Sequence, residues 1–253
     1  MAKIIVFDSG FGSLSIIRPI QKTMKSDIIY FADQKNFPYG KKSKSQLSKI
    51  ITKTIRLLEE KFDPDLIVMG SNTPSLLVSI NKKNVIKVLP PIKKAVKISK
   101  TGNVAILATN TVVKSKTLTE YVRKNRLPKH INLKKIDATK LVRLVEDGKF
   151  LEDKKLCEKI ISKVLFDVFS RINIDVAILS STHLPFLLPF LKKQFPNITF
   201  VDPGKEVAQN VKKIIGRKQS RTNTMKIFTS SDPKKFQQLL VRLGIKKSVT
   251  VLC

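Results

Sequence analysis

Short apolar runs alternate along the chain with segments in which apolar residues recur at helical spacing. The helical pattern is clearest at 47–62 and 157–171. Eight segments are strand candidates, and they are Ile4–Phe7, Ile28–Phe31, Leu66–Met69, Val85–Val88, Val104–Leu107, Ile131–Ile136, Val176–Leu179 and Ile198–Val201. Because strands that alternate with helices form βαβ units, the pattern predicts an α/β fold with mostly parallel sheets.

An internal repeat divides this predicted fold in two. The segment 65–73 (DLIVMGSNT) resembles 175–183 (DVAILSSTH) at an offset of 110 residues, and 5–9 more loosely resembles 105–109 at an offset of 100. Two similar α/β halves are the simplest account. Regular structure should break at Pro90-Pro91 and near Pro203-Gly204. We therefore expect one domain from residues 1–91 plus 205–253, and a second from residues 92–204.

Polar side chains follow several predicted strands, where the ligands of parallel sheets bind. Asp8-Ser9, Ser71-Asn72-Thr73 and Ser181-Thr182-His183 each come directly after, or one residue after, an apolar run. A histidine in that position can act as an acid or a base. The alternative explanation of the segment 71–73 is that its side chains only cap a helix. The segment 37–40 (FPYG) has the composition of a turn, and a turn without a ligand-binding role is the alternative to a place in the site.

Composition excludes several classes of protein. Hydrophobic residues make up 42% of the 253 residues, too many for a disordered chain. The two cysteines, Cys157 and Cys253, form no metal-binding pattern, so we expect neither a disulfide framework nor a metal site. No apolar run has transmembrane length, and the N-terminus lacks a signal-peptide pattern. We expect a cytoplasmic protein without membrane contact. Neither Ser71 nor Ser181 lies in the nucleophile motif of α/β hydrolases.

The formal charge is +30, from 49 basic and 19 acidic residues. Residues 82–135 contain 15 basic residues and one acidic residue, and residues 205–253 contain 12 and two. Such clustering favours a polyanionic partner over a uniform effect of genome composition or solubility, which is the alternative. Tryptophan is absent, which argues against stacking on single-stranded bases. Duplex DNA, structured RNA or a ribonucleoprotein particle is therefore the predicted partner.

The strand-end motifs, taken in order, resemble those of the glutamate racemase family. The segments that carry the resemblance are 7–15 (FDSGFGSLS), 30–33 (YFAD), 38–40 (PYG), 71–73 (SNT), 144–148 (LVEDG), 180–185 (SSTHLP) and 228–236 (FTSSDPKKF). The resemblance implies two pseudosymmetric α/β domains with the site in the interdomain cleft. It also implies racemisation of a small dicarboxylic amino acid without a cofactor, and it allows a homodimer.

Roles for individual residues follow from the resemblance alone. In that family two cysteines exchange the substrate's α-proton on opposite faces, and serines occupy both positions here, Ser71 and Ser181. Asp8 and His183 would assist these two residues, and Glu146 would lie near His183. The residues that would hold the substrate are Ser9, Tyr39, Gly40, Asn72, Thr73 and Thr182.

The two serines make the expected chemistry harder. A thiol ionises near pKa ~8.5, whereas a hydroxyl resembles water at roughly 15.7, a gap of about 7 units or on the order of 10 kcal/mol. Ser13 and Ser180 also replace glycines of the family pattern. Our main hypothesis is therefore a family member with racemisation lost or severely reduced and a polyanion-binding surface. The alternatives are an active glutamate or aspartate racemase that uses serine or histidine, and an enzyme acting on another small carboxylate.

Overall fold

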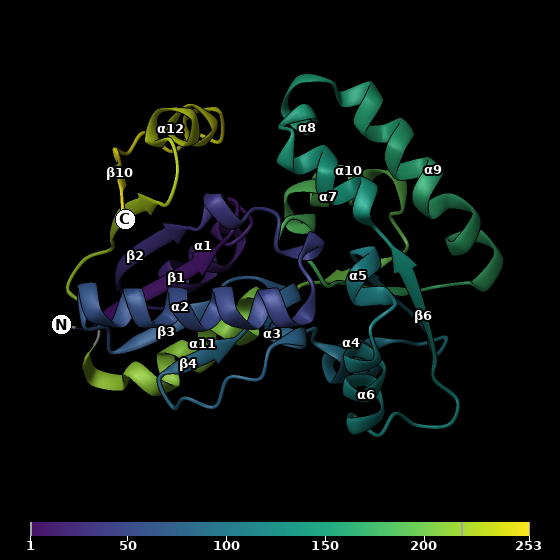
Figure 1. Cartoon of the computed structure of the whole chain (residues 1–253). Coiled ribbons are helices and arrows are strands. Elements are labelled where there is room, and N and C mark those ends of the chain that lie inside the picture. Colours follow the sequence, from purple (N-terminus) through teal and green to yellow (C-terminus); the bar gives the residue numbers. More distant parts are fainter. Residues whose placement is uncertain (1, 219, 253) are drawn as a thin grey trace. The chain divides into compact units, whose positions relative to one another are not determined.

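The computed structural model describes residues 2–218 and 220–252, which form two compact α/β units (Figure 1). The first unit combines Met1–Val88 with Gly204–Cys253, and the second consists of Leu89–Pro203. The C-terminal segment thus returns to complete the N-terminal unit. All strand pairs in both units are parallel, which confirms the fold class predicted from the sequence.

The first unit is built on a six-stranded sheet with the order β10-β9-β2-β1-β3-β4. Its strands are β1 (Lys3–Asp8), β2 (Asp27–Ala32), β3 (Leu66–Met69), β4 (Val85–Lys87), β9 (Thr224–Thr229) and β10 (Val249–Val251). Its helices are α1 (Leu14–Thr23), α2 (Lys44–Phe62), α3 (Asn72–Leu77), α11 (Gly204–Ile215) and α12 (Pro233–Arg242), with short 3₁₀ turns at Gln34–Asn36, Tyr39–Lys41 and Gly216–Lys218.

Helix α2 packs against the central strands of this sheet. It begins with a capping box, in which the Ser43 hydroxyl accepts from the Gln46 amide and the Gln46 side chain accepts from the Ser43 amide. Its apolar side packs into a core with side chains of β1, β2 and β3, and the helical members of that core are Leu47, Ile51, Ile55 and Leu58. The polar positions Lys53 and Arg56 remain exposed.

The second unit has a four-stranded sheet with the order β6-β5-β7-β8. Its strands are β5 (Asn103–Ala108), β6 (Asn132–Asp137), β7 (Val176–Leu179) and β8 (Thr199–Val201). Its helices are α4 (Ile92–Ile98), α5 (Asn110–Val113), α6 (Lys116–Lys124), α7 (Thr139–Glu146), α8 (Lys149–Glu152), α9 (Lys154–Ile172) and α10 (Leu188–Gln194), and a 3₁₀ turn spans Leu184–Leu187.

The internal repeat is confirmed at the level of strand register. Ile4 pairs with Leu66 between β1 and β3, and Val104 pairs with Val176 between β5 and β7, which are the positions related by the offsets of 100 and 110. The backbone continues the match beyond the strands. The Gly70 amide donates to the Phe7 carbonyl at 2.7 Å, and the Ser180 amide donates to the Leu107 carbonyl at 2.9 Å. Each unit therefore presents the same strand-end geometry.

Gly70 permits a close approach that a side chain would obstruct. A Cβ atom at this position would lie 2.5 Å from the Cβ atom of Ser13 and 3.1 Å from the Phe7 carbonyl oxygen. We therefore expect Gly70→Ala to destabilise the protein by about 1–3 kcal/mol, the usual cost of overpacking. At this chain length the melting temperature should fall by roughly 2–4 °C per kcal/mol, measurable by thermal unfolding.

A second substitution controls for the cause of that loss. Ser13→Gly removes the atom that the new Cβ would meet, so the same Gly70→Ala change in a Ser13→Gly background should cost clearly less. An equal loss in both backgrounds would contradict the steric explanation.

In the parts of the chain that the structure describes, no helix is both long enough and apolar enough to span a membrane.

Candidate functional site

The first group of predicted site residues lies at the carboxyl edge of β1 and β3. These strands are neighbours, with Phe7 paired to Met69, so Asp8 and Ser71 emerge at the same edge. The side chains of both are buried. Ser71 precedes α3 as its N-terminal cap by backbone position, but its hydroxyl makes no capping bond to the described residues of that helix. Ser71 is therefore the N-cap of α3 by position only, and its hydroxyl does not contribute to capping.

The side chain of Asn72 uses its nitrogen as a hydrogen-bond donor, whereas its oxygen accepts no hydrogen bond from the described residues. Its side-chain nitrogen donates to the Val88 carbonyl at 3.0 Å. Its Oδ1 atom is buried and has no hydrogen-bond partner among the residues that the structure describes. An unsatisfied buried acceptor costs about 1–3 kcal/mol, so this oxygen favours a ligand that brings a donor. The ammonium group of an amino acid is such a donor.

Tyr39 makes two hydrogen bonds that link its turn to residues directly after β1 and β2. The Tyr39 amide donates to the Ser9 hydroxyl at 3.4 Å, and the Tyr39 hydroxyl donates to Asp33 at 2.9 Å. Burial, followed by the charges of Asp33 and Asp8, raises the pKa of Tyr39 well above its ordinary value, so its hydroxyl keeps its proton and remains a donor. The turn carrying Tyr39 and Gly40 contacts α3, which contains Thr73. The segment is therefore more than a simple turn.

Asp33 is a buried acidic residue at a strand end to which the sequence analysis gave no role. It follows β2, its side chain is buried, and it collects hydrogen bonds from four side chains of the first unit. The donors are Asn36 at 2.9 Å, Tyr39 at 2.9 Å, Ser230 at 3.1 Å and Thr54 at 3.4 Å. The signal in the sequence was an acid directly beyond a strand, the same signal that singled out Asp8.

The second group of predicted residues lies beyond β7 in the second unit. Ser181, Thr182 and His183 are buried there, and the His183 amide donates to the Ser181 hydroxyl at 3.4 Å. Nε2 of His183 lies against Oε1 of Glu146, the last residue of α7, and both side chains are nearly enclosed. A carboxylate in this position holds the imidazole ring in one orientation.

The buried Cys157 on α9 is poorly suited to proton transfer. Burial, with smaller contributions from Glu158 and Asp153, raises the pKa of its thiol to about 11. It belongs to the apolar side of the helix with Ile161 and Leu165. The second cysteine, Cys253, lies outside the described residues.

We expect Cys157 to resist alkylation in the folded protein. At pH 8 a thiol with a pKa of about 11 is only ~0.1% ionised, and the thiolate is the reactive form. In a Cys253→Ser variant, iodoacetamide should leave the native protein unlabelled and label it once after denaturation, as measured by mass spectrometry. Rapid labelling of the native protein would contradict the assigned burial.

Within residues 2–218 and 220–252, no group of three or more histidine, cysteine or acidic side chains is placed to hold a metal ion.

The solved structures similar to this chain define its class by fold. Escherichia coli glutamate racemase, determined with L-glutamate and the activator UDP-MurNAc-ala, matches with a TM-score of 0.84 and 23% identity, covering 100% of this chain and 98% of that one. The Aquifex pyrophilus glutamate racemase matches with a TM-score of 0.72 and 25% identity, covering 98% of both chains. The protein thus has the racemase fold of two parallel α/β units.

Sequence relatives identify the family. Glutamate racemase of Actinobacillus pleuropneumoniae serotype 5b is 30% identical over 219 residues, which cover 84% of this chain and 81% of the relative. The Deinococcus radiodurans enzyme is 28% identical over 250 residues, covering 94% and 85%. No family model matches the chain. On this relationship the chain belongs to the glutamate racemase family, and the relatives favour a racemase over a polyanion binder as its main function.

Proposed function

We propose that this protein is a cytoplasmic, cofactor-independent racemase acting on glutamate or aspartate. The observation that carries the proposal is the His183–Glu146 pair beside Ser181, in a chain related to glutamate racemases. The Escherichia coli and Francisella tularensis neighbours were determined with L-glutamate and D-glutamate respectively. A substrate of the same class suits the buried hydrogen-bonding groups of this chain.

Racemisation needs two proton-transfer groups, because the α-proton leaves one face of the substrate and returns to the other. One candidate is Ser181 with His183. His183 would accept the Ser181 hydroxyl proton, the serine oxygen would remove the α-proton, and Glu146 would stabilise the resulting imidazolium. The other candidate is Ser71, assisted by Asp8, whose hydroxyl would deliver its proton to the planar carbanion. The imidazolium of His183 would then lose its extra proton to solvent and Ser71 would regain one from solvent, which returns both groups to their starting states. Reversing the two roles gives the opposite reaction direction, and no oxidation or reduction occurs.

Binding the substrate would fall to the remaining predicted residues. The free acceptor oxygen of Asn72 suits the substrate ammonium group. Ser9, Thr73 and Thr182 carry hydroxyl groups, and Tyr39 and Gly40 lie in the turn that Ser9 holds by accepting the Tyr39 amide. Hydroxyl and backbone N–H donors are the groups that bind carboxylates without adding charge. These residues would therefore orient the two carboxylates of a dicarboxylic amino acid.

The decisive experiment is α-proton exchange in D₂O, followed by NMR with each enantiomer of glutamate and aspartate. Exchange above that of a His183→Ala control supports the proposal, and the faster amino acid identifies the substrate. Exchange equal to that control for all four compounds would overturn it.

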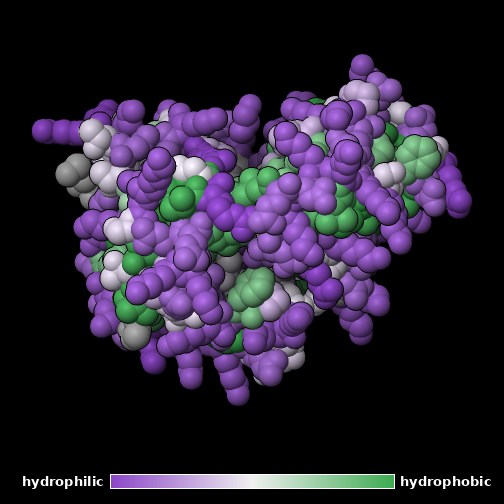
Figure 2. Space-filling model, turned by 90° about the horizontal axis from the view of Figure 1, so that it is seen from above, coloured by the Kyte–Doolittle hydropathy of each residue, from purple (hydrophilic) through white to green (hydrophobic). Residues whose placement is uncertain are grey.

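Polyanion binding is a second candidate function, favoured by the basic side chains of α4 and α6. We define the basic patch as the exposed residues Lys93, Lys94, Lys97, Lys116, Arg123 and Lys124. The Tyr121 hydroxyl of α6 donates to the Pro90 carbonyl just before α4 at 3.0 Å, and the two helices lie side by side in Figure 1. Figure 2 shows one face of the protein, and hydrophilic residues cover most of it.

The basic residues of 205–253 belong to the other unit, so the two basic stretches of the sequence are distributed over both units.

Binding through the basic patch should weaken steeply with salt for a short DNA duplex or a tRNA. Lys93→Glu with Lys97→Glu should weaken it more than Lys212→Glu with Lys213→Glu, a matched exposed pair on α11. Equal effects of the two pairs, or no salt-sensitive binding, would overturn this candidate.

A further inference from the structure

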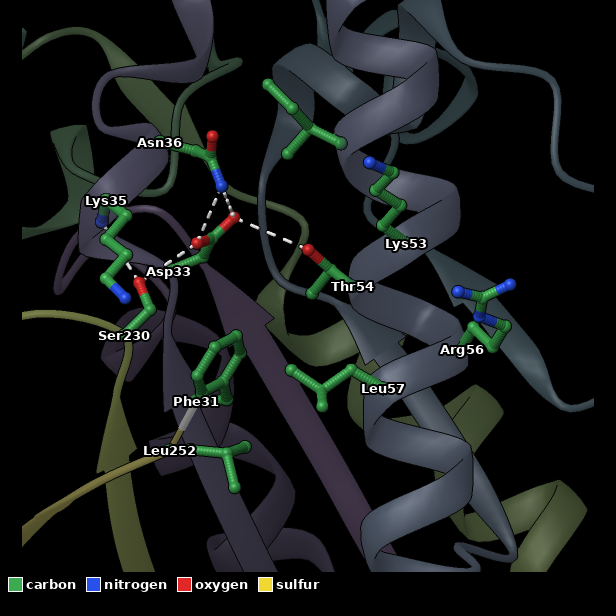
Figure 3. A pocket seen from close by; sticks show the side chains of 11 residues that line it. Phe31, Asp33, Lys35, Asn36, Lys53, Thr54, Arg56, Leu57, Ser230 and Leu252 are labelled. Atoms are coloured by element: carbon green, nitrogen blue, oxygen red, sulfur yellow. Dashed lines mark hydrogen bonds between the residues drawn. The ribbon is translucent and has the colours of Figure 1, made fainter.

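A cavity of about 490 Å³ opens between β2, α2 and the C-terminal segment of the first unit (Figure 3). Its volume is within the range of about 300–1,000 Å³ that small-molecule sites occupy. It lies beyond the carboxyl ends of β2 and β9, where parallel sheets bind ligands. The residues that line it differ from those proposed to bind the amino acid or to move its proton.

The cavity combines an apolar part with a polar part, whose charged side chains are three basic ones (Lys35, Lys53 and Arg56) and the carboxylate of Asp33, which is already hydrogen-bonded to four donors. Phe31, Leu57 and Leu252 form its apolar part, and Figure 3 shows Leu57 of α2 pointing toward Phe31. Lys35, from the 3₁₀ turn after β2, and Lys53, from α2, lie on opposite sides of it. An apolar body with an anionic head fits this combination, because the body is removed from water while the head meets lysines.

A buried carboxylate connects the cavity to the turn that carries Tyr39. Asn36, Thr54 and Ser230 line the cavity and donate to Asp33, and the Tyr39 hydroxyl donates to the same carboxylate. Hydrogen bonds to a carboxylate are stronger than those between neutral groups. The Asp33 carboxylate therefore fixes the positions of its four donor side chains relative to one another. A ligand that moves one of the three cavity donors changes how Asp33 holds Tyr39.

We propose that this cavity is an effector site for a small anion with an apolar body, such as an aryl carboxylate or an aryl phosphate. Its occupancy changes the affinity of the protein for the substrate through Asp33 and Tyr39. The existence of the site is independent of the proposed function, whereas the effect on substrate affinity rests on it.

The first test measures binding of phenyl phosphate by ligand-observed NMR at constant ionic strength. We expect saturable binding, and weaker binding of inorganic phosphate, which lacks the apolar body. Lys53→Glu should weaken phenyl phosphate binding by about tenfold or more, since one attraction becomes a repulsion. Lys49→Glu is the matched control, one turn away on α2 and outside the cavity lining, and should have a much smaller effect.

A second variant tests the apolar part of the cavity. Leu57→Trp should fill the space and abolish binding while thermal unfolding shows a folded protein. Absence of saturable binding to the parent protein, or equal effects of Lys53→Glu and Lys49→Glu, would overturn the site.

The coupling is tested by calorimetric titration of L-glutamate with and without saturating phenyl phosphate. We expect a change in the dissociation constant, and the same factor must appear in the reverse titration. Tyr39→Phe, which removes the bond to Asp33, should bring that factor close to one while phenyl phosphate still binds. An unchanged constant in the parent protein overturns the coupling. Phenyl phosphate binding with no glutamate binding at all contradicts the proposed function and leaves the cavity site standing.

Discussion

Replacing Ser71 and Ser181 together by cysteine should raise the rate of racemisation by roughly 100- to 10,000-fold, the usual contribution of a well-matched general acid or base. A thiol ionises about 7 pKa units more readily than a hydroxyl, so the anionic base becomes accessible at neutral pH. The measurement is the rate of interconversion of D- and L-glutamate by circular dichroism, together with α-proton exchange. The gain should appear mainly in kcat, because the residues proposed to bind the substrate are unchanged.

The single variants separate the two proton-transfer steps. Ser71→Cys or Ser181→Cys alone should give much less than the double variant, because the remaining serine still limits the exchange on its own face. Ser180→Cys is the matched control, since it places a thiol in a position that is also buried, one residue from Ser181. A double variant no faster than the parent protein, or one matched by Ser180→Cys, would show that Ser71 and Ser181 do not meet the α-carbon.

Replacing His183 by alanine should remove the proton transfer that depends on Ser181, a loss of roughly 100- to 10,000-fold. In the proposed mechanism Ser181 removes the α-proton of one enantiomer, and the loss should be larger for that enantiomer. Glu146→Gln keeps the size of the side chain and removes the charge that stabilises the imidazolium, so it should reduce kcat by less and leave KM almost unchanged. Deuterium exchange into each enantiomer of glutamate measures both effects.

Asp8→Asn provides the reciprocal measurement, because Asp8 belongs to the Ser71 group. It should affect the opposite enantiomer more strongly than His183→Ala does. Thermal unfolding of all three variants separates a loss of chemistry from a loss of fold. The same enantiomer preference in the His183 and Asp8 variants would contradict the assignment of one proton-transfer group to each unit.

The core strands were predictable because both faces of a parallel sheet are covered, and such strands appear in a sequence as continuous apolar runs. Every residue of β3 and of β7 is buried, and both strands have the bounds that their apolar runs indicated. Strands β9 and β10 did not give that signal. In β9 only Ile227 and Thr229 are buried, and β10 is a three-residue strand at the edge of the sheet.

The sequence by itself determined the parallel α/β fold, its internal repeat and the polar residues at the strand ends. All three are local properties, since an apolar run and the few residues after it are contiguous in the chain. Tertiary structure alone decided which of those polar groups are already engaged. It places Ser230, 197 residues away, against Asp33, sets Glu146 against His183, and leaves the Asn72 oxygen unpartnered among the described residues. The hydrogen-bonding state of a buried group depends on segments that packing brings together, and no local pattern specifies them.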